Sequence, residues 1–157
     1  LHTNSGILFN HESPRRGETF VTKKITMAAA NIRLGNQTHI ELGNLTAKRD
    51  WGHAKDYVKA MYLMLQQDEP DDYVIATGKT YSVKEFLDEV WEQAKLGSPD
   101  QHLRINKKYF RPQEVPYLLG DSSKATNILG WTPHYDFTGL AKDMYDHDYN
   151  TIIGETR

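Results

Sequence analysis

The sequence predicts an α/β fold in which short strands alternate with about five helices. Short apolar runs, of which Gly6–Phe9 and Asp72–Ala76 are the clearest, are typical of strands. Longer segments carry apolar residues at helical spacing, as residues 20–34 and 83–96 do. The length of 157 residues suits one domain, although a hydrophobic content of 38% is low for a free-standing α/β core.

The first predicted strand, Gly6–Phe9, is an apolar run of the kind that is buried in a sheet. It leads directly into the polar loop Asn10–Gly17, with the sequence NHESPRRG. Ligands of α/β proteins bind at the carboxyl ends of buried strands, and the planar guanidinium of Arg15 or Arg16 suits phosphate oxygens. The loop therefore predicts a phosphate-bearing ligand, with a solvated turn carrying ordinary surface arginines as the alternative.

A helix is predicted over residues 20–34, with one apolar face made of Val21, Ile25, Ala28 and Ile32. Lys23 and Lys24 lie in its first turn, where a cation is unfavourable unless an anion offsets it. The offsetting anion would be a phosphate group, or the two lysines are simply exposed to solvent. The pattern leaves open which of the two lysines would contact the phosphate.

The middle of the chain predicts a strand at Thr38–Gly43 and a helix over residues 54–66. We expect the core face of that helix to consist of Ala54, Val58, Met61, Tyr62 and Leu65. Between these elements, Lys48 and Arg49 bring positive charge beside Trp51.

The next helix is marked most clearly, because Ser82 and Glu85 form the S-x-x-E capping box and Gly97 is a natural stop. Its expected inward side chains are Val83, Phe86, Leu87, Val90, Trp91 and Ala94. This helix carries no evident chemistry.

The last third of the chain predicts a strand at Leu103–Asn106 and two more helices. Asp121 or Ser122 would cap a short helix that ends at Leu129–Gly130. Thr138 would cap the final helix, whose expected inward side chains are Leu140, Ala141, Met144 and Tyr145.

Composition excludes several classes of function. The net charge of -2 argues against a general nucleic-acid or membrane surface, and no nucleic-acid or membrane partner is expected. The short cationic and aromatic segment 107–112 is too small to change that expectation. Cysteine is absent and no two histidines have H-x-x-x-H spacing, so we expect no metal site. No apolar run approaches a membrane span, which makes the cytoplasm the default compartment.

Two motifs carry a resemblance to a known family. The loop NHESPRRG at residues 10–17 and the segment RDWGHAKDYV at residues 49–58 resemble those of GDP-mannose 4,6-dehydratases. These enzymes are extended short-chain dehydrogenase/reductases that act on a nucleotide sugar. The resemblance runs from Gly6 to about Asp148 and includes YFRP at residues 109–112.

The resemblance also shows what the sequence does not contain. A glycine-rich dinucleotide loop is absent, and no tyrosine has a lysine four residues later, as the catalytic pair of this family requires. The resemblance therefore implies the C-terminal, substrate-binding portion of an extended Rossmann-type dehydratase, without its N-terminal dinucleotide-binding half. We expect no catalytic residue here. Residues 1–157 would form one nucleotide-sugar-binding domain, with a cofactor or interface loop in 1–19, helices and short strands in 20–150 and a frayed tail in 151–157.

The complete enzyme implied by the resemblance uses NADP to convert GDP-mannose to GDP-4-keto-6-deoxy-mannose, the first step of GDP-fucose synthesis. Family positions that contact NADP match His11 and Arg16. Family positions that contact the substrate match Asn10, Lys24, Arg49, Arg111 and Glu114. Arg49 would reach the diphosphate, Glu114 would accept hydrogen bonds from ribose hydroxyls, and Asp50 would orient local structure. The complete enzyme would be a homodimer or homotetramer.

Two other classes share most of these features. One is a free-standing nucleotide-sugar-binding module, which should bury its own first strand. The other is an assembly protein without a ligand, which predicts no affinity for GDP. Half of a dehydratase should instead expose an apolar strand edge and face where the cofactor-binding half would dock.

Overall fold

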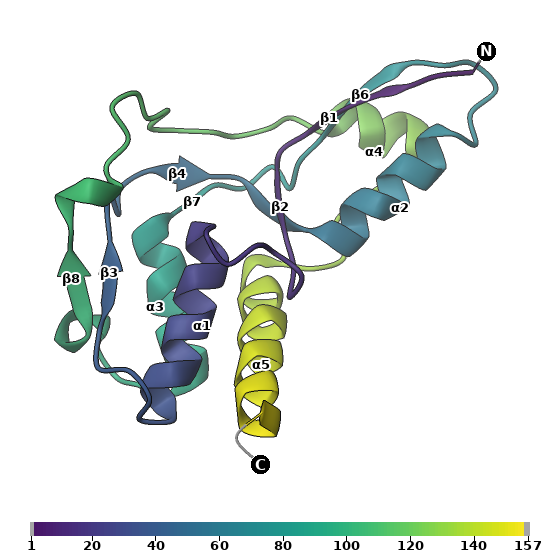
Figure 1. The fold of residues 1–157 in the computed structure, drawn as a ribbon. Coiled ribbons are helices and arrows are strands. Elements are labelled where there is room, and N and C mark those ends of the chain that lie inside the picture. The colour runs from purple at the N-terminus through teal and green to yellow at the C-terminus, as the bar shows by residue number, and fades with distance from the viewer. Residues whose placement is uncertain (1, 156–157) are drawn as a thin grey trace.

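The computed structural model describes residues 2–155 (Figure 1), and these form an α/β structure with five α-helices and short strands. The elements in chain order are β1 (Ser5–Leu8), β2 (Asn10–Glu12), α1 (Val21–Arg33), β3 (Ile40–Leu42), β4 (Lys48–Arg49), β5 (Trp51–His53), α2 (Ala54–Met64), β6 (Asp72–Ile75), β7 (Tyr81–Ser82), α3 (Val83–Ala94), the 3-10 helix η1 (Pro99–Gln101), β8 (Leu103–Ile105), the 3-10 helix η2 (Lys107–Tyr109), α4 (Ser123–Leu129) and α5 (Phe137–Glu155).

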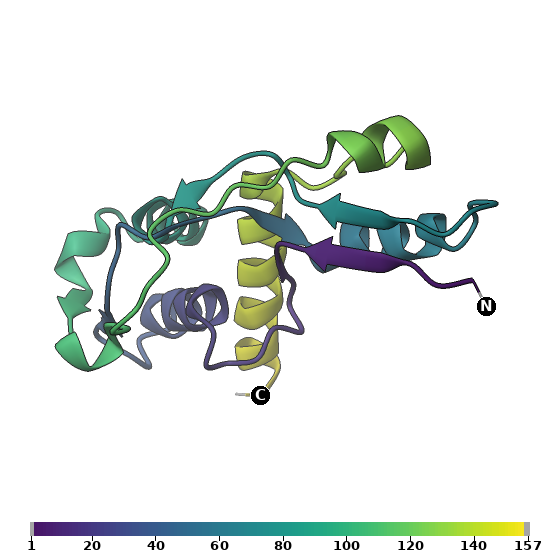
Figure 2. The ribbon, with the colours of Figure 1, turned by 90° about the horizontal axis from the view of Figure 1, so that it is seen from above.

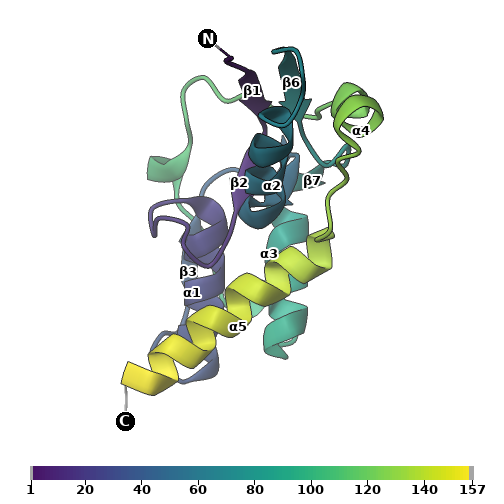
Figure 3. The same cartoon turned by 90° about the vertical axis from the view of Figure 1, so that its right-hand side faces the viewer.

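The larger of two hydrophobic cores lies among α1, α3 and α5, which pack against one another. In Figure 3, α5 crosses in front of the other two helices. Phe86, Trp91 and Met144 are fully buried in this core. Helix α3 begins with the predicted capping box: the Ser82 hydroxyl accepts from the Glu85 N–H, and the Glu85 carboxylate accepts from the Ser82 N–H. Its six predicted inward side chains are all buried, which confirms the periodicity.

The smaller core lies at the other end of the molecule, where α2 and α4 pack beside the β1–β6 pair (Figure 2). Tyr57, Ile75 and Trp131 are fully buried there. The Trp131 indole N–H donates to the Asp56 carbonyl oxygen at 2.8 Å and so joins α2 to the segment after α4.

The strands of residues 2–155 form four separate pairs. The pairs β1–β6, β2–β5 and β3–β8 are parallel, and β4–β7 is antiparallel. In the β2–β5 pair, Asn10 stands opposite Trp51 and Glu12 stands opposite His53. This register places the NHESPRRG loop beside the RDWGHAKDYV segment, although about 40 residues separate them in the sequence.

Strand β1 corrects one sequence prediction. The strand forms where expected, but it is largely exposed rather than buried, with Ile7 56% accessible to solvent. The reason is its position: β1 pairs with β6 along one edge, and among residues 2–155 no strand pairs with its other edge.

Helix α2 corrects a second prediction. Four of the five side chains expected in the core are exposed, with Val58 61%, Tyr62 63%, Leu65 59% and Met61 40% accessible, and the fifth, Ala54, is half-buried. The opposite face is buried instead, through Tyr57, Ala60 and Met64. Helix α2 carries an apolar stripe on each of two faces, so periodicity alone could not show which stripe meets the core.

Helix boundaries account for the remaining differences. Helix α3 ends at Ala94, and its C-cap is Lys95, which adopts the left-handed conformation at φ +54°, two residues before the predicted stop at Gly97. Asp136 rather than Thr138 accepts a backbone N–H at the start of α5, from Gly139 at 2.7 Å. The tail predicted to fray from Thr151 is helical to Glu155, because Ile152 packs against the larger core; residues 156 and 157 lie outside the described part.

None of the helices within residues 2–155 combines the length and apolar character that crossing a membrane requires.

Candidate functional site

A cavity of about 350 Å³ lies beside the larger core, and its size falls at the lower end of the range for small-molecule sites. All five predicted substrate contacts line it, together with the predicted cofactor contact Arg16. The five are Asn10 from β2, Lys24 from α1, Arg49 from β4, and Arg111 and Glu114 from the segment before α4. The fold thus brings together residues that are up to 104 positions apart.

The NHESPRRG loop (residues 10–17, called the signature loop below) is held in place by its buried glutamate, Glu12. Glu12 is 2% accessible, accepts a hydrogen bond from the Thr22 hydroxyl at 2.6 Å and forms an ion pair with Arg16 Nε at 3.0 Å. Burial raises the pKa of Glu12 above its usual value, and the bonds from Thr22 and Arg16 oppose that rise. The Arg16 guanidinium also lies 3.5 Å from the centre of the Phe20 ring, so two contacts fix its orientation.

His11 lies on a second hollow of about 320 Å³, which it shares with Asn10, Arg16 and the apolar end of β1. Its Nδ1 is 2.9 Å from the Phe9 carbonyl oxygen. Because a carbonyl oxygen only accepts, Nδ1 carries a proton and donates it in this contact. The ring stacks on the buried Tyr57 ring at 5.0 Å between centres. The hollow therefore combines an imidazole, a guanidinium and an apolar wall.

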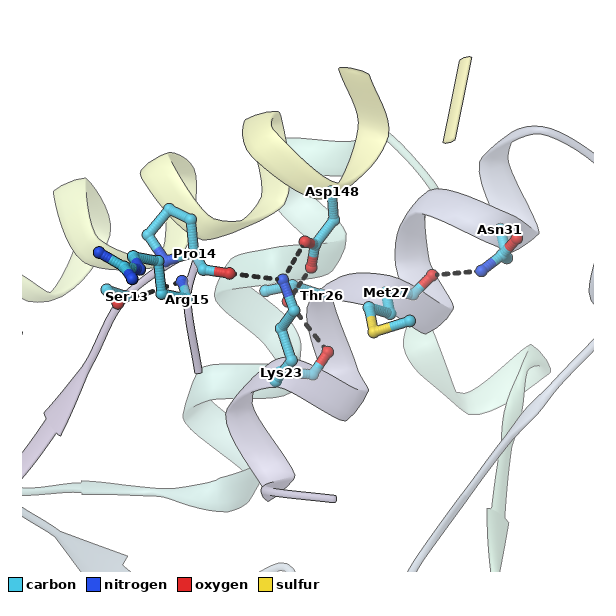
Figure 4. Close-up of polar contacts among 8 residues, drawn as sticks. All are labelled: Ser13, Pro14, Arg15, Lys23, Thr26, Met27, Asn31 and Asp148. Atoms are coloured by element: carbon cyan, nitrogen blue, oxygen red, sulfur yellow. Dashed lines mark hydrogen bonds and ion pairs between the residues drawn. The ribbon is translucent and has the colours of Figure 1, made fainter. Parts of the chain in front are cut away.

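The two lysines at the start of α1 have different surroundings. Lys23 is buried, and its ammonium donates to the Pro14 carbonyl oxygen at 2.8 Å and to the Asp148 carboxylate (Figure 4). The Thr26 hydroxyl donates to the other oxygen of Asp148 at 2.6 Å. The anion that offsets Lys23 is thus a carboxylate of α5, which removes Lys23 as a phosphate contact.

Lys24, by contrast, lies at the cavity. Its ammonium is 3.7 Å from the centre of the Tyr109 ring, an exposed cation–π contact that a stronger anionic partner can replace. A hydrogen bond from Lys108 lowers the pKa of Tyr109, and the charge of Lys24 adds to that effect. Arg111 is exposed at the cavity and makes no hydrogen bond or ion pair with any other described residue. The charge of Arg111 is therefore available to a ligand.

Arg49 and Glu114 contact each other in the wall of the cavity. Arg49 Nη2 lies 3.3 Å from Glu114 Oε1, and Arg49 Nη1 donates to the carbonyl oxygens of Lys48 and Val115. The other oxygen of Glu114 accepts from the Asn44 side-chain amide at 2.9 Å. Asn44 lines the cavity but was predicted only as a loop residue. The sequence around Asn44, Asn-x-Thr, indicates only an Asx turn, because that turn depends on neighbouring residues. It does not indicate the contact with Glu114, which lies 70 residues away.

Asp50 orients the local backbone beside the site, the role that the family resemblance implied. It is fully buried and accepts hydrogen bonds from the backbone N–H groups of Thr77, Gly78 and Gly120, and from the Thr77 hydroxyl. A Cβ atom at Gly120 would lie 2.2 Å from that of Ala76, so the backbone approaches closely there. Asp50 therefore ties the segment that carries Arg111 and Glu114 to the end of β6.

Within residues 2–155, no group of three or more histidine and carboxylate side chains is arranged to hold a metal ion. The side chains that line the cavity suit binding, and they include four cations, two carboxylates and two amides.

Comparison with solved structures identifies the fold. RMD from Pseudomonas aeruginosa, complexed with NADPH, matches with a TM-score of 0.84 at 18% identity, over 93% of this chain and 48% of that one. The dTDP-glucose 4,6-dehydratase from Bacillus anthracis, in complex with NAD, matches with a TM-score of 0.77 at 17% identity, over 93% and 44%. At these identities the comparison shows the fold, which this chain shares with about half of each of these enzymes.

Sequence comparison then identifies the family. The family model described as GDP-mannose 4,6 dehydratase matches residues 1–144, and the chain belongs to this family. GDP-mannose 4,6 dehydratase 1 of Arabidopsis thaliana is 57% identical over 94% of this chain and 41% of its own length. The Homo sapiens GDP-mannose 4,6 dehydratase is 49% identical over 94% of this chain and 44% of its own length. The chain thus spans less than half the length of these relatives.

Proposed function

We propose that this chain is the GDP-binding portion of a GDP-mannose 4,6-dehydratase, the NADP-dependent lyase that converts GDP-mannose to GDP-4-keto-6-deoxy-mannose. The observation that carries the proposal is the cavity of about 350 Å³ lined by all five residues that match substrate contacts of the family. Family membership supports the identity of the substrate.

The roles follow from charge and geometry. Arg49, Lys24 and Arg111 supply the positive charge that a diphosphate requires, and Arg49 is held in place by two backbone carbonyl groups. Glu114 is a carboxylate that only accepts hydrogen bonds, which suits the hydroxyl groups of a ribose. Asn10, at the start of β2, would add an amide contact to the diphosphate.

The residues of the second hollow fit part of an NADP site. An imidazole, a guanidinium and an apolar strand end are groups that can contact the amide, phosphate and ring surfaces of a dinucleotide. NADP, when bound in the complete enzyme, supplies the hydride exchange of the dehydratase reaction. His11 and Arg16 would bind and orient it, and Glu12 keeps Arg16 in position.

The exposed edge of β1 and the apolar stripe of α2 support a partner region that completes the structure. Ile7 of β1 and Val58 and Tyr62 of α2 are each more than half accessible, and exposed apolar side chains that gather on a surface are typical of an interaction site. We propose that these surfaces meet the cofactor-binding half of the same enzyme, which would carry the catalytic Tyr-x-x-x-Lys pair. The complete enzyme would then assemble as a homodimer or homotetramer.

Calorimetric titration with GDP tests the binding role directly. Saturable binding that weakens between low and moderate salt is expected, because the contacts are charged and lie at an accessible cavity. GMP should bind more weakly than GDP, since it lacks one of the two phosphates. If the chain is folded by circular dichroism and GDP shows no saturable heat, the binding role is refuted.

A turnover assay tests whether the catalytic groups lie outside this chain, in the proposed cofactor-binding half. The pure chain should form no keto sugar from GDP-mannose, even with added NADP. Formation of that product by the chain alone would show that the catalytic groups are present here after all. A free-standing binding module gives the same two results, but it predicts a buried first strand, and the exposure of Ile7 favours the dehydratase.

A further inference from the structure

Glu114, the side chain proposed to read the ribose, belongs to a segment without regular secondary structure between η2 and α4. Its carboxylate is held from two sides: Oε1 by Arg49 Nη2 at 3.3 Å and Oε2 by Asn44 Nδ2 at 2.9 Å. The side chain is 20% accessible, so it is open to a ligand but not free to turn. Without these two contacts, nothing in the local backbone would fix its direction.

Asn44 is itself fixed, and its orientation is unambiguous. Its side-chain oxygen accepts from the Thr46 backbone N–H at 2.9 Å and from the Thr46 hydroxyl at 2.8 Å. A backbone N–H can only donate, so the oxygen of the amide must face Thr46 and the NH₂ group must face Glu114. The Asx turn thus acts as a rigid base from which the amide points at the carboxylate.

We propose that Asn44 is a positioning residue that aims Glu114 at the ribose hydroxyls and thereby selects ribonucleotides over deoxyribonucleotides. This inference rests on the proposed GDP site. Each carboxylate oxygen can accept a second hydrogen bond beside the one it already accepts, and an ionised carboxylate can bind only hydrogen-bond donors such as hydroxyl groups. A site built to bind a hydroxyl group rejects an analogue without it, because the acceptor is then left unpaired.

The negative charge of the Glu114 carboxylate is offset by the Arg49 guanidinium, at 3.3 Å. The guanidinium of Arg49 contacts Glu114 directly and is held in place by the carbonyl groups of Lys48 and Val115. Glu114 and Asn44 form the part of the cavity wall that suits a neutral, hydroxyl-bearing group. Arg111 and Lys24 supply the cationic part.

The test compares the affinities of the chain for GDP, 2′-deoxy-GDP and 3′-deoxy-GDP by calorimetric titration. Wild-type protein should prefer GDP to at least one deoxy analogue by about tenfold to a hundredfold, the range of one charge-assisted hydrogen bond. Asn44→Asp keeps the acceptor for the Asx turn but replaces the amide donor by a charge that repels Glu114. In this variant the preference should fall below about threefold, as it should in Glu114→Gln.

Thr46→Val is the matched control, because it removes the hydroxyl contact to Asn44 while keeping the backbone N–H that orients the amide. It should retain the wild-type preference. The inference is overturned if wild type binds GDP and both deoxy analogues equally, or if folded Asn44→Asp keeps the full preference. A folded wild-type chain that binds no GDP overturns the proposed function, and the inference with it.

Discussion

Replacing Asp148 by alanine should lower the free energy of unfolding by about 2.5–4.5 kcal/mol. Asp148 is 4% accessible, and its removal leaves the buried Lys23 ammonium with the Pro14 carbonyl oxygen as its remaining partner (Figure 4). Breaking a buried ion pair costs about 3–5 kcal/mol. Alanine returns about 0.5 kcal/mol, because it is a better helix former than aspartate.

Asp146→Ala is the matched control on the same helix. Asp146 pairs with Lys142 on the surface of α5, where both side chains are about half accessible. That pair contributes about 0.3–0.5 kcal/mol, which the gain in helix propensity offsets. The two variants remove the same side chain from the same helix and differ in burial.

Urea denaturation followed by circular dichroism measures both variants. A single small domain has about 5–15 kcal/mol of stability, so the expected loss is large but leaves a folded baseline. Lys23→Met combined with Asp148→Leu should recover most of the loss, since an apolar pair can replace a buried ion pair. The reasoning is refuted if Asp148→Ala lies within about 1 kcal/mol of Asp146→Ala.

Three further predictions concern the site, a helix cap and the α2 surface. Arg49→Ala should weaken GDP binding by about 1.5–3 kcal/mol in a titration, whereas the exposed Arg104→Ala should leave it unchanged, and equal effects would remove Arg49 from the site. Hydrogen bonds from the Ser82 backbone N–H, and to a smaller extent from the Ser82 hydroxyl, hold the pKa of Glu85 below 4.5. The stability that these bonds contribute is therefore complete above pH 4.5, and it is lost as the pH falls through the lowered pKa of Glu85. Glu85→Gln should therefore be less stable than wild type near neutral pH, and denaturation curves should converge in acid; a constant difference would contradict this assignment. Tyr62→Ser, at a position 63% accessible, should change stability by less than about 0.5 kcal/mol, and a loss above about 1.5 kcal/mol would place this stripe in a core.

Local signals in the sequence predicted the elements that depend on local physics. The capping box of Ser82 and Glu85 fixes the start of α3, and the spacing of its apolar residues fixes the buried face. The candidate site came from motif resemblance, and the structure gathers its five predicted substrate contacts around one cavity. Their individual roles stay predictions.

Long-range contacts explain what the sequence could not show. Lys23 and Lys24 are neighbours in one helical turn, and their environments differ because α5 places Asp148 beside the first and not the second. The orienting role of Asn44 depends on a partner 70 residues away. The exposed stripe of α2 could not be distinguished from its buried stripe, since both are apolar and the choice depends on which surfaces surround the helix.

The contact between Lys23 and Asp148 has a consequence for synthesis of the chain. The two residues are 125 positions apart, and Lys23 also holds the Pro14 carbonyl group of the signature loop. During translation, α1 leaves the ribosome long before α5 exists, so the ammonium has no counter-charge until residue 148 has been made. The loop that bears His11 and Arg16 is translated before α5, so its contact with Lys23 is secured only after residue 148 has been made.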